Sequence, residues 1–369
     1  MLLDKHHVIS LLQKLCLTPG VSGYEEPIRQ VLIAELSKVG VSKDQIEVDA
    51  LGNLIVKVSE GKPHIVFMSH MDEVGFIVRD IDEKGFAYIM NIGGLLERDI
   101  ISRVVVVYGT GKELEGKDIL ERRIYGVVGA KPTHILAMRG KRGEFREVLP
   151  EMRDLIVDFG FKSREEAEKY ICIGDFGHVY KNFIELANAI TCPSLDDRVG
   201  CLALLLALRE VVNEDVKHGL TIVFTTQEEI GSRGSIVAAY HVKPDIVIAV
   251  DATHAVDYPL LSSRDYTRIE LGKGPVICRG PPITDEIAMK IMKLANQIKF
   301  ENERFNYQLE YSSGRSGTDI DLAQITREGS KAALISIPLR YMHTPIETCN
   351  IEDILLTIKL LREVMVKLR

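Results

Sequence analysis

The sequence predicts an α/β protein in which a mostly parallel sheet is sandwiched by helices and carries a small inserted β-barrel domain. In residues 1–73 and 182–369, short β-branched runs alternate with amphipathic helical patterns, which is typical of a parallel sheet covered on both faces. Residues 74–181 instead contain short β-rich runs between Gly, Pro and charged turns, as expected for a small barrel. With 369 residues, the chain is long enough for both domains.

The first part of the α/β domain is expected to begin with two helices. Apolar residues at helical spacing between Ile9 and Cys16 predict the first helix, and Pro19-Gly20 ends it. A second helix is predicted at about 25–39. Strands are then expected at 46–49, 54–58 and 64–68.

The inserted region differs from its surroundings because helical pattern is scarce in it, except near residues 163–170. Short runs rich in β-branched and aromatic residues predict its strands. These strands are expected at 76–78, 87–90, 103–108, 124–129 and 155–157. We expect them to form a separate barrel-like domain.

The alternation of helices and strands resumes from residue 182. A strongly apolar stretch at 199–212 predicts a buried helix, and the run at 220–226 predicts a buried strand. The remaining expected elements are a helix at 232–240, a strand at 246–250, a helix at 287–299, a strand at 332–337 and an amphipathic helix at 351–368. Sites in such sheets lie beyond the carboxyl ends of the strands, so polar residues that follow strands are candidates.

The composition is that of an ordinary globular protein and argues against several other classes. The net charge of −7 argues against nucleic-acid binding. The six cysteines lie far apart without a C-x-x-C pair, which fits neither a disulfide framework nor a zinc knuckle. The N-terminus lacks the apolar region of a signal peptide, and no apolar run reaches the roughly 18 residues that cross a bilayer. We therefore expect a cytoplasmic protein that binds neither nucleic acid nor membranes.

Acids and histidines follow four of the predicted strands. His70 and Asp72 follow strand 64–68, and Glu228 and Glu229 follow strand 220–226. Asp251 follows strand 246–250, and His343 comes shortly after strand 332–337. A further pair, Asp196 and Asp197, stands at the start of helix 199–212. Because the carboxyl ends of parallel strands meet at one edge of a sheet, we expect these side chains to converge there.

This set of side chains has the composition of a divalent metal site. Histidine nitrogens and carboxylate oxygens suit Zn²⁺, and also Co²⁺ or Mn²⁺. Two such ions need a shared anionic ligand, which an aspartate can provide. Glu228 and Glu229 are adjacent at a strand end and point in different directions, so one can bind metal while the other moves protons. Their residue types alone leave open which of them does which.

Each of these signals has a commoner structural explanation. A single histidine such as His70 is usually a structural or surface residue, a Glu-Glu pair usually belongs to a solvated face, and Asp196-Asp197 could simply cap a helix. The repeated placement of such residues directly after β-branched strands favours a metal site over separate coincidences. His254, close to Asp251, is a further candidate for substrate contact.

Over essentially its whole length, the chain resembles the dinuclear metallo-aminopeptidases of the tetrahedral (TET) and glutamyl-aminopeptidase type, which are often labelled endoglucanase or cellulase. An ordered set of motifs carries the resemblance. They are PGVSGYE at 19–25, SHMDEVG at 69–75, GAKPTH at 129–134, DDRVG at 196–200, QEEIG at 227–231, VDATHA at 250–255, GTD at 317–319 and RYMHTPIE at 340–347.

The resemblance implies a role for each candidate residue. His70 and Asp251 would bind one metal ion, Glu229 and His343 would bind the other, and Asp196 would bridge the two. Asp72 would orient His70, and Asp197 would help to hold the bridging loop, often through a cis peptide in this clan. Glu228 would be the general base. The two ions would be Zn²⁺ or Co²⁺, with Mn²⁺ as a further candidate.

The resemblance also implies an activity and an assembly. The chain would be an aminopeptidase that removes N-terminal residues from short peptides. Residues 1–73 and 182–369 would form the catalytic domain, and residues 74–181 would form a PDZ-like domain that serves dimerisation. Dimers of this type assemble into hollow dodecamers.

Three other functions remain open. A carboxypeptidase or N-acyl amino-acid deacylase of the same clan would use similar ligands, but in that branch the first two ligands lie close in sequence, whereas the insert separates His70 from Asp196. A glycan hydrolase needs two carboxylates on either side of a sugar bond, and adjacent glutamates do not normally face each other. A non-catalytic assembly module should lack a ligand or the base, and none is missing.

Overall fold

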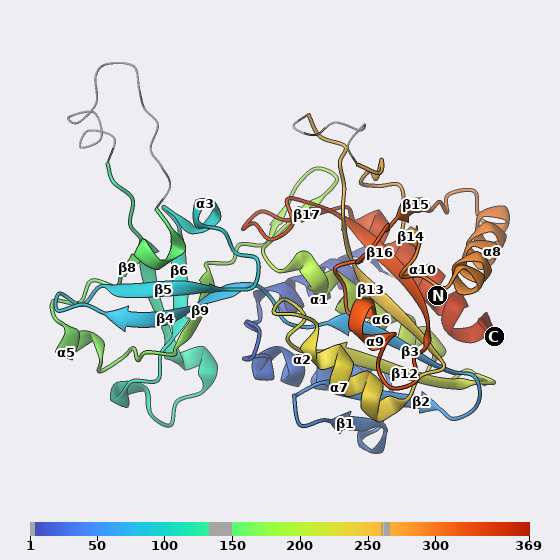
Figure 1. Cartoon of the computed structure of the whole chain (residues 1–369), viewed down its shortest axis with the longest axis horizontal. Helices are drawn as coiled ribbons and strands as arrows, with labels where there is room; N and C mark the ends of the chain where they lie inside the picture. The colour runs from blue at the N-terminus through green and yellow to red at the C-terminus, as the bar shows by residue number, and fades with distance from the viewer. Residues whose placement is uncertain (1–3, 133–149, 260, 262–265) are drawn as a thin grey trace. The chain divides into compact units, whose positions relative to one another are not determined.

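The computed structural model describes residues 4–132, 150–259, 261 and 266–369, and it divides into two compact units. Unit 1 comprises Met1–Glu73 and Asn182–Arg369, and unit 2 comprises Val74–Lys181 (Figure 1). The predicted class, an α/β sheet domain with an inserted β-barrel, is confirmed. Thr133 and His134, which end one of the motifs above, lie outside the described residues.

The sheet of unit 1 is mixed, with a parallel centre and antiparallel edges. Its four central strands run parallel in the order β12, β3, β13, β16. The edges pair antiparallel, as β2 does with β12 and β17 with β16. The strands are β1 (Ile46–Val48), β2 (Leu54–Ser59), β3 (His64–His70), β10 (Ile184–Glu185), β11 (Ile190–Thr191), β12 (Gly219–Thr225), β13 (Ile246–His254), β14 (Val276–Arg279), β15 (Gln308–Tyr311), β16 (Lys331–Arg340) and β17 (Thr348–Cys349).

The register of the central strands brings their carboxyl ends together. Thr225 at the end of β12 lies beside His70 at the end of β3. Asp251 of β13 lies beside Ser336 of β16. β13 continues to His254, four residues beyond the predicted strand end, so Asp251 belongs to the strand itself.

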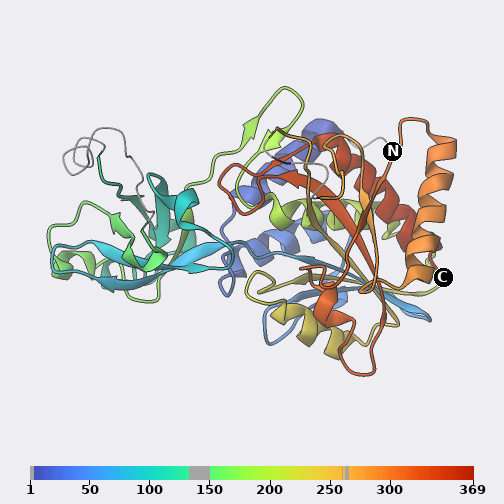
Figure 2. The same ribbon diagram turned by 45° about the horizontal axis from the view of Figure 1, so that its top comes forward.

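Helices cover both faces of this sheet. The first face carries α1, α2, α6 and α10, and the opposite face carries α7 and α9. In Figure 2 the yellow α7 and the orange-red α9 lie below the strands, and the dark red α10 lies above them. The helices are α1 (Lys5–Leu17), α2 (Glu26–Lys38), α6 (Leu195–Val211), α7 (Arg233–Val242), α8 (Asp285–Glu301), α9 (Ile320–Ala323) and α10 (Ile351–Lys367), with a 3₁₀ turn η1 (Lys43–Gln45).

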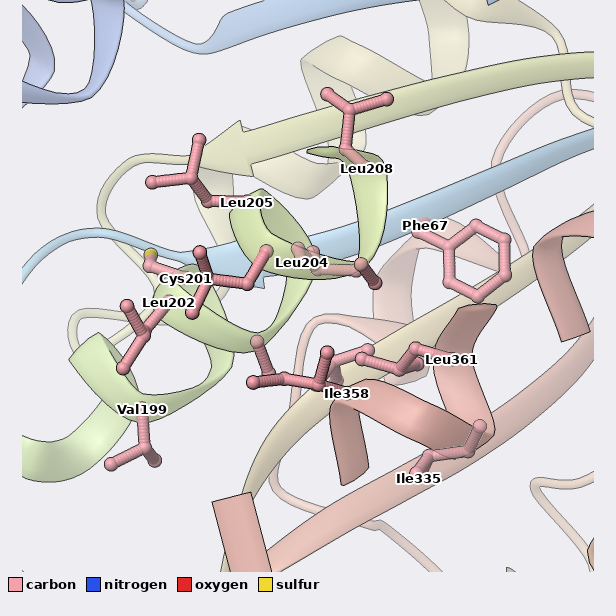
Figure 3. Close-up of a cluster of buried hydrophobic side chains, with 14 of the residues drawn as sticks. Phe67, Val199, Cys201, Leu202, Leu204, Leu205, Leu208, Ile335, Ile358 and Leu361 are labelled. Atoms are coloured by element: carbon pink, nitrogen blue, oxygen red, sulfur yellow. The ribbon is translucent and has the colours of Figure 1, made fainter. Parts of the chain in front are cut away.

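The main hydrophobic core lies between α6, α10 and the sheet. α6 is apolar on all sides because α1, α10 and the strands surround it, and most of its residues are fully buried. Figure 3 shows Leu204 of α6 on the side of that helix that faces Ile358 and Leu361 of α10, and Leu208 on the other side of α6. This packing fixes the N-terminal end of α6, which carries Asp196 and Asp197, against the carboxyl ends of the central strands.

Unit 2 is a closed barrel with its own hydrophobic core. Its strands follow one another around the barrel in the order β4 (Gly75–Ile81), β5 (Ala87–Ile92), β8 (Ile156–Asp158), β7 (Arg123–Val128), β6 (Val104–Tyr108) and β9 (Phe176–Val179). β9, which closes the barrel between β6 and β4, was not among the strands expected from the sequence. The short helical elements are α3 (Glu97–Ile100), α5 (Arg164–Ala167), η2 (Lys112–Leu114), η3 (Ile119–Arg122) and η4 (Met152–Asp154).

Within the described ranges of both units, no helix combines the length and the apolar character that a membrane span requires.

Candidate metal centre

The structure brings eight candidate residues to one edge of the unit 1 sheet, namely His70, Asp72, Asp196, Asp197, Glu228, Glu229, Asp251 and His343. Five of them lie at the end of a strand or in the loop that follows it. Asp251 lies within β13, and Asp196 and Asp197 lie at the start of α6. Two groups of these side chains place their ligand atoms within 4.8 Å of one another, namely His70 with Asp197 and Asp251, and His70 with Asp196 and Glu229. Their nitrogen and oxygen atoms are those that zinc, cobalt and manganese bind.

Asp196 lies between the two histidines. Its Oδ1 is 3.2 Å from Nε2 of His70, and its Oδ2 is 3.3 Å from Nε2 of His343. Each histidine also faces a second carboxylate. Nε2 of His70 is 3.8 Å from Oδ1 of Asp251, and Nε2 of His343 is 3.3 Å from Oε1 of Glu229. The five side chains therefore form two His-carboxylate pairs that share Asp196.

Asp72 is fully buried and accepts three hydrogen bonds around the site. Its Oδ1 accepts the backbone N–H of Glu228 at 3.0 Å, and its Oδ2 accepts that of Glu229 at 3.1 Å. The hydroxyl of Ser22 donates to Oδ2 at 2.6 Å. Oδ1 also lies 3.5 Å from Nδ1 of His70, close enough for an electrostatic interaction but too far for a well-formed hydrogen bond. A carboxylate in this position leaves Nε2 of His70 to face the site.

The adjacent glutamates have different surroundings. The carboxylate of Glu229 lies against His343, whereas Oε1 of Glu228 accepts the hydroxyl of Ser232 at 2.9 Å. Within the described residues, Glu228 makes no ion pair with either histidine. Burial raises the pKa of Glu228 to about 8; the charge of His70 opposes this rise, and the charges of Asp319, Glu229 and Asp72 add to it. Glu228 therefore holds a proton more readily than an exposed glutamate.

Asp197 is part of the support for Asp196. The peptide bond between them is cis, and both residues have non-helical backbone angles although they lie within the bounds of α6. Oδ2 of Asp197 accepts the hydroxyl of Ser69 at 2.6 Å, and Oδ1 accepts the backbone N–H of Gly200 at 3.0 Å. Both oxygens thus bind donors outside the set of candidate metal ligands, whereas those of Asp196 face the two histidines.

The site contains an excess of buried negative charge. Burial raises the pKa of Asp251 well above its ordinary range, and the charges of Asp197 and Asp196 raise it further. Burial also raises the pKa of Glu229. For Asp196, burial raises the pKa, but His343 and His70 lower it more, so the net shift is downward. Buried carboxylates are unfavourable unless a cation compensates them, so this donor set fits divalent metal ions.

Two further buried acids contact the site and were missed by the sequence analysis. Glu347 accepts the backbone N–H of His343 at 2.8 Å and that of Asp196 at 3.1 Å, so it holds two of the candidate ligands. Asp319 accepts the hydroxyl of Thr225. Both residues lie in motifs that carry the family resemblance, and that position was the signal that could have identified them.

Comparison with known proteins identifies the family of this chain. The sequence profile of the M42 glutamyl aminopeptidases matches residues 52–360. A lysyl aminopeptidase from Pyrococcus furiosus is 34% identical over 364 residues, which cover 97% of each chain. The region matched by the profile includes all eight candidate residues.

Solved structures agree with this result. An aminopeptidase from the archaeon Desulfurococcus kamchatkensis is 31% identical with a TM-score of 0.85, over 98% of this chain and 95% of that one. The TET1 peptidase of Pyrococcus horikoshii, described as assembling into a tetrahedron or a large octahedral shell, is 30% identical with a TM-score of 0.82, over 98% and 100% of the two chains.

Proposed function

The chain belongs to the M42 glutamyl aminopeptidase family and is a peptide hydrolase, and on that premise we propose that it is a dinuclear metallo-aminopeptidase that releases single N-terminal residues from short peptides. Zn²⁺ or Co²⁺, with Mn²⁺ as a further candidate, would occupy the centre. The position of Asp196 between two histidines is the observation that carries this proposal. A carboxylate whose two oxygens face two different histidines is suited to bridge two cations.

The proposed ligands divide into two sets around this bridge. His70 and Asp251 would bind one ion, and Glu229 and His343 would bind the other. Asp72 would act through His70, because it lies beside Nδ1 and so favours metal binding by Nε2. Divalent ions at these positions would polarise the scissile carbonyl and make a water molecule more acidic.

Glu228 would move the protons of the reaction. Its raised pKa supports this role, because a carboxylate that titrates near neutral pH can both accept and release a proton there. It would accept the proton of the attacking water and deliver it to the departing amine. Ser232 would hold one oxygen of its carboxylate in place.

Two measurements test this proposal. The wild-type protein should hydrolyse aminoacyl-p-nitroanilides, lose this activity in a chelator, and regain it with Zn²⁺, Co²⁺ or Mn²⁺. A chelated, metal-free sample that retains full activity would rule out the metal mechanism. Glu228→Gln should lose turnover by more than about 100-fold yet bind metal like the wild type, because the substitution removes only the proton acceptor. Unchanged turnover in this variant would exclude Glu228 as the base.

We further propose that the chain self-associates, with dimers that assemble into a dodecamer. The similar Pyrococcus horikoshii structure is described as a tetrahedron or a large octahedral shell. Unit 2 exposes apolar side chains on neighbouring strands of its barrel, including Val104, Tyr125 and Val127, which supports its role in dimerisation. Light scattering coupled to size-exclusion chromatography measures the assembly directly, and a monomer would contradict it.

The family leaves the preferred N-terminal residue undetermined. The profile that matches this chain describes glutamyl aminopeptidases, whereas the relative described above is a lysyl aminopeptidase. Proteins that share this fold are thus named for N-terminal substrate residues of opposite charge. The preference of this chain must depend on its own residues.

A further inference from the structure

A cavity of about 330 Å³ lies in unit 1 beside the candidate metal centre. Its lining includes Thr253 and His254, which follow Asp251 on β13, and Thr318, which precedes Asp319. Ser336, which also lines the cavity, is paired with Asp251 across β13 and β16, so this wall of the cavity adjoins the candidate ligand Asp251. A cavity of this volume can hold one amino-acid side chain.

Glu310 of β15 contributes a carboxylate to this cavity. Its Oε2 accepts the hydroxyl of Thr253 at 2.6 Å, and its Oε1 accepts the hydroxyl of Ser336 at 3.0 Å. Two hydroxyl donors, one on each oxygen, fix the direction in which the carboxylate faces.

Both hydroxyl donors are close neighbours of the candidate metal ligand Asp251. Ser336 is paired with Asp251 in the register of β13 and β16, and Thr253 lies two residues further along β13 on the same face of the sheet. Two residues of a strand span about 6.6 Å. An extended side chain of four carbons that ends in an ammonium group covers a similar distance. The carboxylate is therefore within reach of a substrate side chain whose main chain lies at the metal centre.

The charge of Glu310 has no partner among the basic side chains of the described residues. Its hydrogen-bond donors are neutral hydroxyls, and burial raises its pKa. Arg315 also lines the cavity, but this residue is exposed, so that solvent screens its charge. A partly buried carboxylate without a cation favours binding of a cationic group.

We propose that Glu310 receives the positively charged side chain of the substrate's N-terminal residue, so that the enzyme prefers lysine or arginine at that position. This inference rests on the proposed aminopeptidase function. A cationic side chain would supply the countercharge that Glu310 lacks, while Thr253 and Ser336 hold the carboxylate in the orientation that receives it. An acidic N-terminal side chain would meet a like charge in the same cavity and would be rejected.

The experiment compares p-nitroanilides of lysine, arginine, norleucine, leucine and glutamate on the metal-loaded wild type. Norleucine carries the four-carbon chain of lysine without its ammonium group, so the ratio of kcat/KM for lysine over norleucine isolates the charge. We expect the wild type to favour lysine by about 10- to 100-fold, the range of a hydrogen bond to a charged group. In Glu310→Gln this ratio should fall to near one, while the rate on leucine stays within a few fold. Glu303→Gln is the matched control, since Glu303 is an exposed glutamate that precedes β15 by a few residues.

The outcomes separate this inference from the proposed function. Hydrolysis of leucine and norleucine substrates without preference for lysine in the wild type would overturn the role of Glu310 and leave the aminopeptidase function intact. Hydrolysis of none of the p-nitroanilides would instead contradict the proposed function. An equal loss of rate on all five substrates in Glu310→Gln would mean that the carboxylate binds the α-amine or is structural, which also overturns the inference. Calorimetric titration of the wild type with free L-lysine and L-norleucine gives a readout without turnover, and tighter binding of lysine is expected.

Discussion

Asp72→Asn tests whether metal binding at the candidate centre depends on Asp72, which is proposed to orient His70 and not to bind a metal ion itself. The substitution keeps the shape of the side chain but replaces one carboxylate oxygen with an NH₂ group. Oδ1 and Oδ2 each accept a backbone N–H, from Glu228 and Glu229 respectively. In either orientation of the amide, one of these N–H groups therefore faces another donor, because an NH₂ group cannot accept a hydrogen bond.

The magnitude follows from these contacts. One unpaired buried N–H costs about 1–3 kcal/mol of stability. The loss of the negative charge beside Nδ1 also makes His70 a weaker ligand. Changes in residues that orient metal-binding histidines typically weaken metal binding by about 10- to 100-fold. We expect that loss of metal affinity, together with a lower kcat/KM at limiting metal.

The assay is a titration of chelator-treated protein with Zn²⁺ against a chromophoric competitor. Asp175→Asn is the matched control, because Asp175 is also buried and accepts two backbone N–H groups and one hydroxyl, but lies in unit 2. It should keep the metal affinity of the wild type. It should lose less stability than Asp72→Asn, because both backbone N–H groups donate to one oxygen, Oδ2, which the amide oxygen of asparagine can replace. If Asp72→Asn bound Zn²⁺ as tightly as Asp175→Asn, the assigned role of Asp72 would be wrong.

Two other substitutions probe the scaffold. Leu204→Ala removes a fully buried side chain of α6 and should lower the free energy of unfolding by about 2–5 kcal/mol. Urea denaturation measures this loss, and an effect below about 1 kcal/mol would contradict the close packing of α6 against α10. Burial raises the pKa of Asp353 from 3.8 to about 7, so the folded state binds this proton more tightly than the unfolded state. The stabilising contribution of the Asp353 proton is therefore complete below about pH 4 and is lost as the pH rises through 7. Thermal unfolding should show the wild type losing stability relative to Asp353→Asn between these two pH values. A difference between the two that does not change with pH would contradict the raised pKa.

Much of the fold and of the candidate site could be predicted because both follow local rules. The alternation of strands and helices predicted the central strands, and the rule that polar residues gather after parallel strands pointed to residues that the structure does place together. His70 and Glu229 lie in segments far apart in sequence, yet the register of β3 with β12 brings those segments side by side. The hydrophobic pattern of the sequence predicts the positions of these strands because they are long and buried.

The parts that were missed depend on contacts that the local sequence does not encode. β14 and β15 have four residues each and lie near the sheet edge, so they give little periodic signal. Glu310 was missed for the same reason. Its two hydroxyl partners lie 57 and 26 residues away, and only the fold brings them to its carboxylate. The sequence predicted that the helix of α6 starts at Val199, because the apolar pattern on which the prediction relied does not include the polar Asp196 and Asp197. Both of these residues have non-helical backbone angles.

The inserted unit separates the residues of the candidate metal centre in the sequence, but carboxylates from the segment that precedes the insert hold this site together. Glu25 accepts the backbone N–H of Gln227, and Asp72 accepts the next two, so three successive amides of one loop bind acids of residues 1–73. Glu73, the last residue before the insert, accepts the hydroxyl of Ser194, just ahead of Asp196. Neither segment of unit 1 can therefore form the site alone. An insert at residues 74–181 is compatible with this centre only if it returns the chain to the place where these hydrogen bonds form.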